Sequence, residues 1–101
     1  MDKQRFTENK QGLIKHLNDF LGDGERALTP ENFGQLRPIV DALFPAARAL
    51  GVDIGSLQTD YKIELVQSSG GPNNPSAGRL GYIKGHLMEL RDKVEAYNPS
   101  N

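Results

Sequence analysis

The amino-acid sequence predicts an all-α fold of four to five helices in a single domain that spans residues 1–101. Two long segments, one near each end of the chain, carry apolar residues at helical spacing, and turn-forming residues separate the segments. With 101 residues, of which 37% are hydrophobic, the chain is large enough for one small core. We therefore expect a small helical bundle with a proline-broken middle and a long, heptad-patterned C-terminal helix.

The first helix is expected to begin near Thr7 and to end near Gly22. The Thr7 hydroxyl is suited to cap the free amides of the first turn, with Glu8 next to the positive end of the helix dipole. Gly22 and Gly24 then end the helix and turn the chain. One face carries the apolar residues Phe6, Leu13, Ile14, Leu17, Phe20 and Leu21.

A second start signal is Thr29-Pro30-Glu31, which combines a capping side chain, a proline at the first helical position and an acidic residue. The apolar stripe that follows consists of Phe33, Leu36, Ile39, Val40, Leu43 and Phe44, and Ala47 and Leu50 continue it. Pro38 and Pro45 interrupt this pattern, because each removes an amide donor and crowds the preceding turn. The sequence thus predicts either two or three short helical pieces or one kinked helix.

Residues 53–67 are ambiguous, because their apolar residues fit a helical face while 61–65 alternate as in a strand. A lone strand has no partner in this sequence, so we expect a helix here. The following segment, residues 68–78, is dense in glycine, proline, asparagine and serine. It predicts an exposed and mobile loop.

The last helix is expected to run from about Ser76 or Gly78 to Tyr97. Its apolar residues repeat every three or four positions, which indicates a seam packed nearly parallel or antiparallel to a neighbour: Leu80, Ile83, Leu87, Leu90, Val94 and Tyr97. The opposite side carries Gly78, Gly81, Gly85 and Met88. Glycine inside a helix costs about 0.5–1 kcal/mol relative to alanine. Either another helix, from the same chain or a partner, approaches this side closely, or the first turn with Gly78 and Gly81 is frayed or belongs to the loop.

Composition excludes several classes of protein. The absence of cysteine excludes disulfides and thiolate metal sites, and it fits a reducing cytoplasm. The net charge of −1 lacks the basic footprint of a typical nucleic-acid binder, although a local basic patch remains compatible with it. Neither a signal-peptide core nor an apolar run of about 18 residues is present, so we expect no export and no membrane insertion.

One stretch carries a DNA-binding pattern. Ala47 is followed four residues later by Gly51, then by the apolar Val52, with Leu57 in the next segment. This spacing resembles the core of a helix-turn-helix motif, which implies a DNA-binding regulator centred on residues 46–66. Asp60 stands where the motif has an apolar core residue. The implied recognition helix also carries more acidic than basic residues, and acidic side chains repel phosphates.

Two further parts of the sequence carry residues typical of ligand or metal sites. The loop at 68–79 leads into a helix start with Arg79 and Lys84 nearby, a generic site for an anionic ligand or nucleotide, but it lacks the lysine and hydroxyl of a P-loop. Each histidine has an acidic residue three positions later. The carboxylates of these pairs, His16 with Asp19 and His86 with Glu89, point away from the apolar faces, so we expect no metal site and no cofactor.

The favoured function is non-catalytic protein–protein interaction or oligomerisation, as an adaptor or inhibitor, because no catalytic signature is present. The partner is expected to be another protein or a second copy, with a homodimer as the working hypothesis. The predicted interface lies on the C-terminal helix and comprises Leu80, Ile83, Gly85, Leu87, Met88, Leu90, Val94 and Tyr97. The helix-turn-helix regulator and the binder of an anionic ligand are the alternatives.

Overall fold

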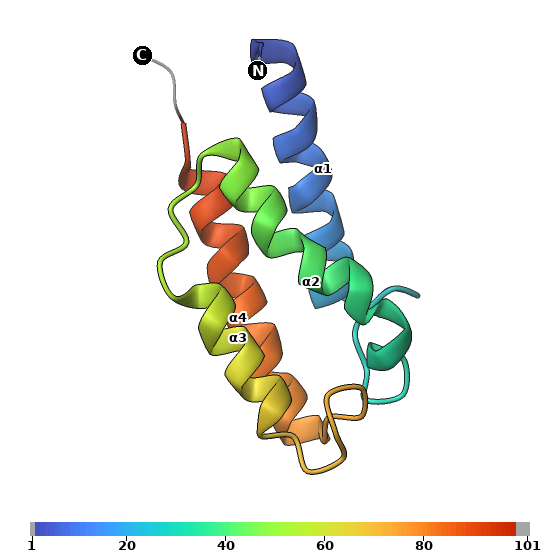
Figure 1. The fold of residues 1–101 in the computed structure, drawn as a ribbon. Helices are drawn as coiled ribbons and strands as arrows, with labels where there is room; N and C mark the ends of the chain where they lie inside the picture. Colours follow the sequence, from blue (N-terminus) through green and yellow to red (C-terminus); the bar gives the residue numbers. More distant parts are fainter. Residues whose placement is uncertain (1, 99–101) are drawn as a thin grey trace.

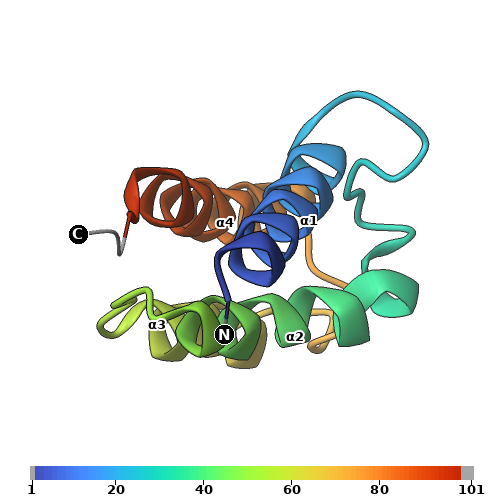
Figure 2. The same cartoon turned by 90° about the horizontal axis from the view of Figure 1, so that it is seen from above.

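The computed structural model describes residues 2–98 and contains, within that range, four α-helices and no strand. They are α1 (Lys3–Leu21), α2 (Phe33–Leu50), α3 (Leu57–Val66) and α4 (Ala77–Ala96). The all-α class is confirmed, and the ambiguous stretch at 61–66 is helical. The helices form two layers, with α1 and α4 in one and α2 and α3 in the other (Figures 1 and 2). The molecule measures 45 × 28 × 18 Å.

Helix α1 begins earlier than the sequence predicts, at Lys3 rather than near Thr7. The Asp2 side chain accepts a hydrogen bond of 2.8 Å from the Arg5 amide, so Asp2 is the cap and Thr7 lies inside the helix. An aspartate caps as well as a threonine, and the earlier start adds a turn that places Phe6 against Tyr97. The predicted end at Gly22 is confirmed.

Helix α2 is a single continuous helix, so of the two forms that the sequence allows, the separate short pieces are wrong and one helix is found. Pro38 and Pro45 both lie inside it, and both are exposed. The prolines deprive the carbonyls of Gly34 and Asp41 of their helical partners, but neither of these residues is fully buried. The buried side of α2 keeps its packing, which outweighs two missing hydrogen bonds on the solvent side.

The segment between α3 and α4 is not the wholly exposed loop that the sequence predicts. Ser68 and Pro75 are buried, and Asn73 accepts a hydrogen bond of 3.1 Å from Arg37 of α2. The backbone of Asn73 also lies close to Gly34, where a larger residue would crowd it. The hydrogen bond from Arg37 and the close approach that Gly34 permits thus hold this segment against α2. Helix α4 already begins at Ala77, with Ser76 as its cap.

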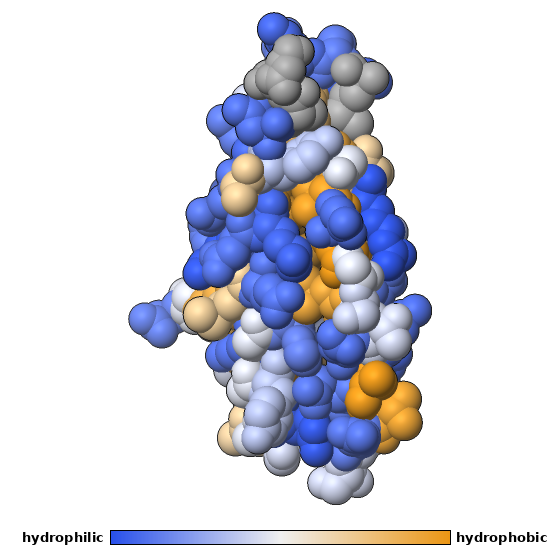
Figure 3. Space-filling model, turned by 90° about the vertical axis from the view of Figure 1, so that its left-hand side faces the viewer, coloured by the Kyte–Doolittle hydropathy of each residue, from blue (hydrophilic) through white to orange (hydrophobic). Residues whose placement is uncertain are grey.

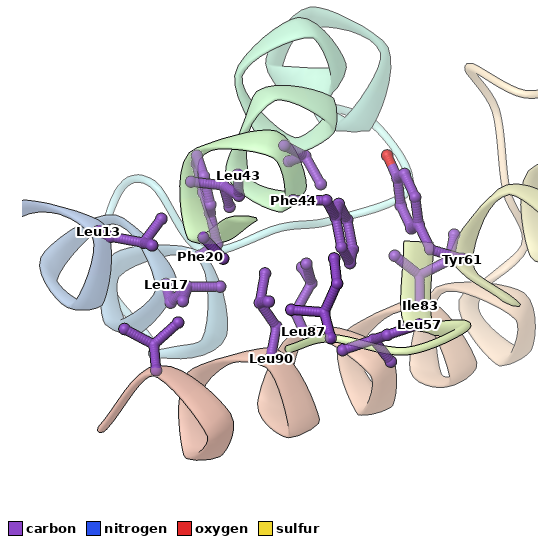
Figure 4. Packing of buried hydrophobic residues seen from close by; sticks show 14 of the residues in the cluster. Leu13, Leu17, Phe20, Leu43, Phe44, Leu57, Tyr61, Ile83, Leu87 and Leu90 are labelled. Atoms are coloured by element: carbon purple, nitrogen blue, oxygen red, sulfur yellow. The ribbon is translucent and has the colours of Figure 1, made fainter. Parts of the chain in front are cut away.

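Helix α4 is the centre of the packing, because it contacts each of the other three helices. Figure 4 shows side chains from all four helices meeting in one cluster, including Leu17 of α1, Phe44 of α2, Leu57 of α3 and Leu87 of α4. Each fully buried aliphatic or aromatic side chain contributes about 1.5–3 kcal/mol relative to exposure. The apolar face of α4 is therefore covered by the other three helices of the same chain.

Candidate interaction surface

Most of the predicted interface on α4 lies in the core of the chain. Five of its residues are at most 4% exposed, and they are Leu80, Ile83, Leu87, Leu90 and Val94. Tyr97 is partly buried, and its carbonyl accepts a hydrogen bond of 2.7 Å from the Lys10 side chain of α1. These six residues support the fold, and only Gly85 and Met88 of the predicted set face outward.

The glycine side of α4 is open within the described part of the chain. A Cβ atom added at Gly78, Gly81 or Gly85 would meet no atom within 4 Å. The close approach that the glycines predict is therefore not made by residues 2–98. Met88 is 48% exposed on this side, but the exposed Glu89 and Asp92 surround it with charge. Figure 3 shows the side of the molecule that lies on the left in Figure 1 as mostly hydrophilic, with a narrow hydrophobic strip and one small hydrophobic area near an edge.

The predicted anion contact Arg79 is already paired. Its guanidinium donates to Glu64 of α3 at 2.5 Å and lies over the ring of Tyr82. His86 Nε2 lies 3.0 Å from the other oxygen of Glu64. Burial raises the pKa of Glu64, but the hydrogen bonds from His86 and Arg79 outweigh it and hold the pKa below its ordinary value of 4.5. The carboxylate is thus ionised at neutral pH and joins α3 to α4. Within residues 2–98, Lys84 makes no hydrogen bond or ion pair.

The segment that resembles a helix-turn-helix motif does form two helices, α2 and α3, joined by residues 51–56. Gly51 ends α2 in the left-handed conformation, with φ of 102°. The exposed side of α3 presents Lys62 beside Ile63 and Val66, and Asp60 is partly exposed. One basic residue on this face leaves few contacts for phosphates.

The histidine pairs do not assemble into larger clusters. Within residues 2–98, no group of three His, Cys, Asp or Glu residues is placed to hold a metal ion. His16 stacks on Phe20, with ring centroids 6.3 Å apart, and Asp19 pairs with Lys15. The two histidines therefore belong to separate contacts.

An apolar surface that the sequence reasoning missed lies on α2. Of the eight exposed residues in this helix, only Gln35 and Arg48 are polar. The six others define what we call the outer face of α2: Pro38, Ile39, Ala42, Pro45, Ala46 and Ala49. Ile39, which the sequence assigns to the core stripe, is 39% exposed. A helix that is apolar on nearly all sides is normally buried, so this face indicates a contact outside the chain.

The outer face of α2 continues into a groove against α1. The groove has a volume of about 390 Å³. Ile39, Ala42, Ala46 and Ala49 form the α2 side, together with edges of the buried Leu43 and Leu50, while Glu8, Asn9, Gly12, Leu13 and His16 form the α1 side. The alanine side chains on the α2 wall, and Gly12 on the α1 wall, leave room for another helix to approach closely.

A signal for this face is present in the sequence. Between residues 38 and 49 the only charged residues are Asp41 and Arg48, which lie seven positions apart and so on the same side of a helix. The remaining positions are apolar on two faces, one more than a core-facing helix needs. The two prolines make the second apolar face difficult to recognise, because they predict a broken helix rather than one continuous helix with two apolar faces.

The fold and this surface define a small all-α bundle with an apolar helix face open to solvent. Comparison with known protein families, curated proteins and solved structures gives no match. Over residues 2–98, none of the helices combines the length and apolar character that crossing a membrane requires.

Proposed function

We propose that this chain is a non-catalytic protein-interaction module, and that the outer face of α2 with the adjoining α1–α2 groove is its binding surface. One observation carries the proposal: six of the eight exposed residues of α2 are apolar and contiguous along the helix. Single exposed apolar residues are normal on a protein surface, whereas a contiguous apolar face marks an interaction site. The proposal keeps the function that the sequence favours and moves the interface from α4 to α2.

The composition of the face supports a protein partner. The core of a protein interface is depleted of charge and is apolar, while its rim is polar. On α2 the apolar residues form the centre, Asp41 and Arg48 border it on one side, and Glu8 of α1 lies on the other. An amphipathic helix fits a groove of this kind with anchors spaced three or four residues apart.

The titratable groups that meet in the structure support a non-catalytic role. Glu64, Arg79 and His86 satisfy one another between α3 and α4. The lowered pKa of Glu64 makes it a poor general acid or base near neutral pH, since catalytic groups have a pKa close to the working pH. This cluster therefore acts as a structural contact between helices.

The experiment is selection of amphipathic helical peptides from a displayed library against the dilute wild-type chain. The dissociation constants of enriched peptides are then measured for the wild type, Ala46→Glu and Met88→Glu. Ala46 lies in the groove and Met88 on α4, and both are exposed, so neither change disturbs the core.

We expect Ala46→Glu to weaken peptide binding at least about tenfold, because a carboxylate would be desolvated in the apolar groove. Met88→Glu should bind as the wild type does. Peptides that bind all three proteins equally, or a selection that enriches none, would contradict the proposed binding surface.

A further inference from the structure

Building on the proposed function, we infer that the partner of the outer face of α2 is a second copy of this chain, with the two α2 helices packed antiparallel about a two-fold axis. Most oligomers of soluble proteins are symmetric, and a two-fold interface uses the same surface patch on both subunits. Such a patch must be complementary to itself when the direction of the helix is reversed. Both the spacing and the charges of α2 meet this condition.

The spacing of the exposed residues reads the same in both directions. Pro38, Ala42, Pro45 and Ala49 follow one another at intervals of four, three and four, and all are exposed. At 100° per residue they lie within about 60° of one another, which makes a narrow contact stripe. Reversal about the midpoint of the stripe places Pro38 opposite Ala49 and Ala42 opposite Pro45 of the other copy, so apolar residues meet only apolar residues.

The charges beside the stripe are complementary in the same arrangement. Asp41 and Arg48 flank the stripe on one side, seven residues apart, like the charged positions that border a coiled-coil seam. A two-fold axis perpendicular to the helices keeps this flank on the same side in both copies and reverses its direction. Asp41 of one copy then lies within about 3 Å, along the helix axis, of Arg48 of the other. The symmetry produces this pair twice.

Both charged residues remain accessible for the pairing. The Asp41 side chain is 41% exposed although it contacts Arg37 and the Tyr61 hydroxyl. Arg48 is exposed and donates a hydrogen bond of 2.8 Å to Gln58 through one of its nitrogens. In a parallel pair the two-fold axis runs along the helices and places the charged flanks of the two copies on opposite sides of the seam, so Asp41 and Arg48 would not meet across it. The charges therefore favour the antiparallel pair.

The first test is sedimentation equilibrium of the full chain from roughly 1 to 500 µM, because self-association depends on concentration. We expect the wild type to approach twice the monomer mass of 11.1 kDa as the concentration rises. The double variant Ala42→Glu/Ala46→Glu should stay monomeric with an unchanged melting temperature in the dilute limit, since it brings four carboxylates together at the interface. Met88→Glu is the matched control and should dimerise like the wild type.

The second test distinguishes the two orientations with single cysteines, which this cysteine-free chain reports cleanly. In the antiparallel pair, Ala42 lies about 4.5 Å along the axis from its own counterpart, whereas Ala49 lies about 16 Å from its own. A disulfide needs Cα atoms closer than about 7 Å. Under mild oxidation Ala42→Cys should cross-link to itself, and Ala49→Cys should not.

Three results would contradict the antiparallel dimer. A wild type that stays monomeric at every concentration, a dimer lost with Met88→Glu but kept with the double variant, or efficient cross-linking through Ala49→Cys would each overturn the antiparallel pair. The peptide selection separates this inference from the proposed function. A monomeric wild type that still binds peptides through Ala46 would end the dimer inference and leave the proposed function standing.

Discussion

The hydroxyl group of Tyr61 donates a hydrogen bond of 2.6 Å to Asp41, and this contact joins α3 to α2. The Tyr61 ring is fully buried and stacks on Phe44, with ring centroids 4.8 Å apart. Burial of the hydroxyl, and then its bond to the Asp41 carboxylate, raise the pKa of Tyr61 well above its ordinary value of 10.0. The Tyr61 hydroxyl therefore stays protonated in the folded state.

Tyr61→Phe should keep the ring stack and lose the hydrogen bond, at a cost of about 1 kcal/mol in the free energy of unfolding. The melting temperature at pH 7 should fall by about 4–8 °C, as measured by circular dichroism. Because the pKa of Tyr61 is raised in the folded state, its contribution is complete below pH 10 and is lost as the pH rises further. Tyr61→Phe should lose less stability than the wild type above pH 10. Equal losses would contradict the role of this hydroxyl.

Leu87→Asp should abolish folding, whereas Met88→Asp should leave the melting temperature within about 2 °C of the wild type. Leu87 is 0% exposed at the centre of the core, and its neighbour Met88 is 48% exposed. An aspartate at position 87 would place an unpaired charge among apolar side chains, a cost comparable to the whole stability of a small domain. A folded Leu87→Asp variant would show that the α4 seam is not part of the core.

Gly85→Ala and Gly51→Ala should change stability in opposite directions. The Gly85 position has open space within α4, so alanine should stabilise the helix by about 0.5–1 kcal/mol. Gly51 has a φ of 102°, and a Cβ there would also collide with the Tyr97 hydroxyl, so alanine should cost at least about 1–2 kcal/mol. Chemical denaturation measures both. A destabilised Gly85→Ala variant would instead indicate a close approach at α4 by a partner.

Glu64→Gln should lower the free energy of unfolding at pH 7 by about 1 kcal/mol, a figure reduced because the pairing with Arg79 and His86 is partly open to solvent. The folded chain lowers the pKa of Glu64 below 4.5, so its contribution is complete above that pH and is lost as the pH falls below it. The difference between wild type and variant should thus shrink in acid. A difference independent of pH between 3 and 7 would contradict an ionised Glu64 in this contact.

The helices were predictable where the signal is local. Ser76 caps α4, the seam residues repeat along it, and Gly22 ends α1, and each of these features is decided by residues a few positions apart. The sequence predicts the start of α1 near Thr7, but Asp2 is able to cap as well and does so in the structure. With the cap at Asp2, Phe6 lies inside the helix and contacts Tyr97 from the other end of the chain, a contact that local sequence does not reveal.

The tertiary structure decided which apolar faces are buried. Periodicity along α4 shows that one of its faces must be buried. It does not show what buries this face. In the structure α1, α2 and α3 all pack against it, through contacts between residues far apart in the sequence. The same convergence leaves the second apolar face of α2 uncovered. Packing on the buried side of α2 likewise keeps the helix continuous, although two prolines lie on its exposed side. Helix type and rough extent are thus properties of neighbouring residues, whereas the identity of the free surface follows from how the four helices are arranged around one core.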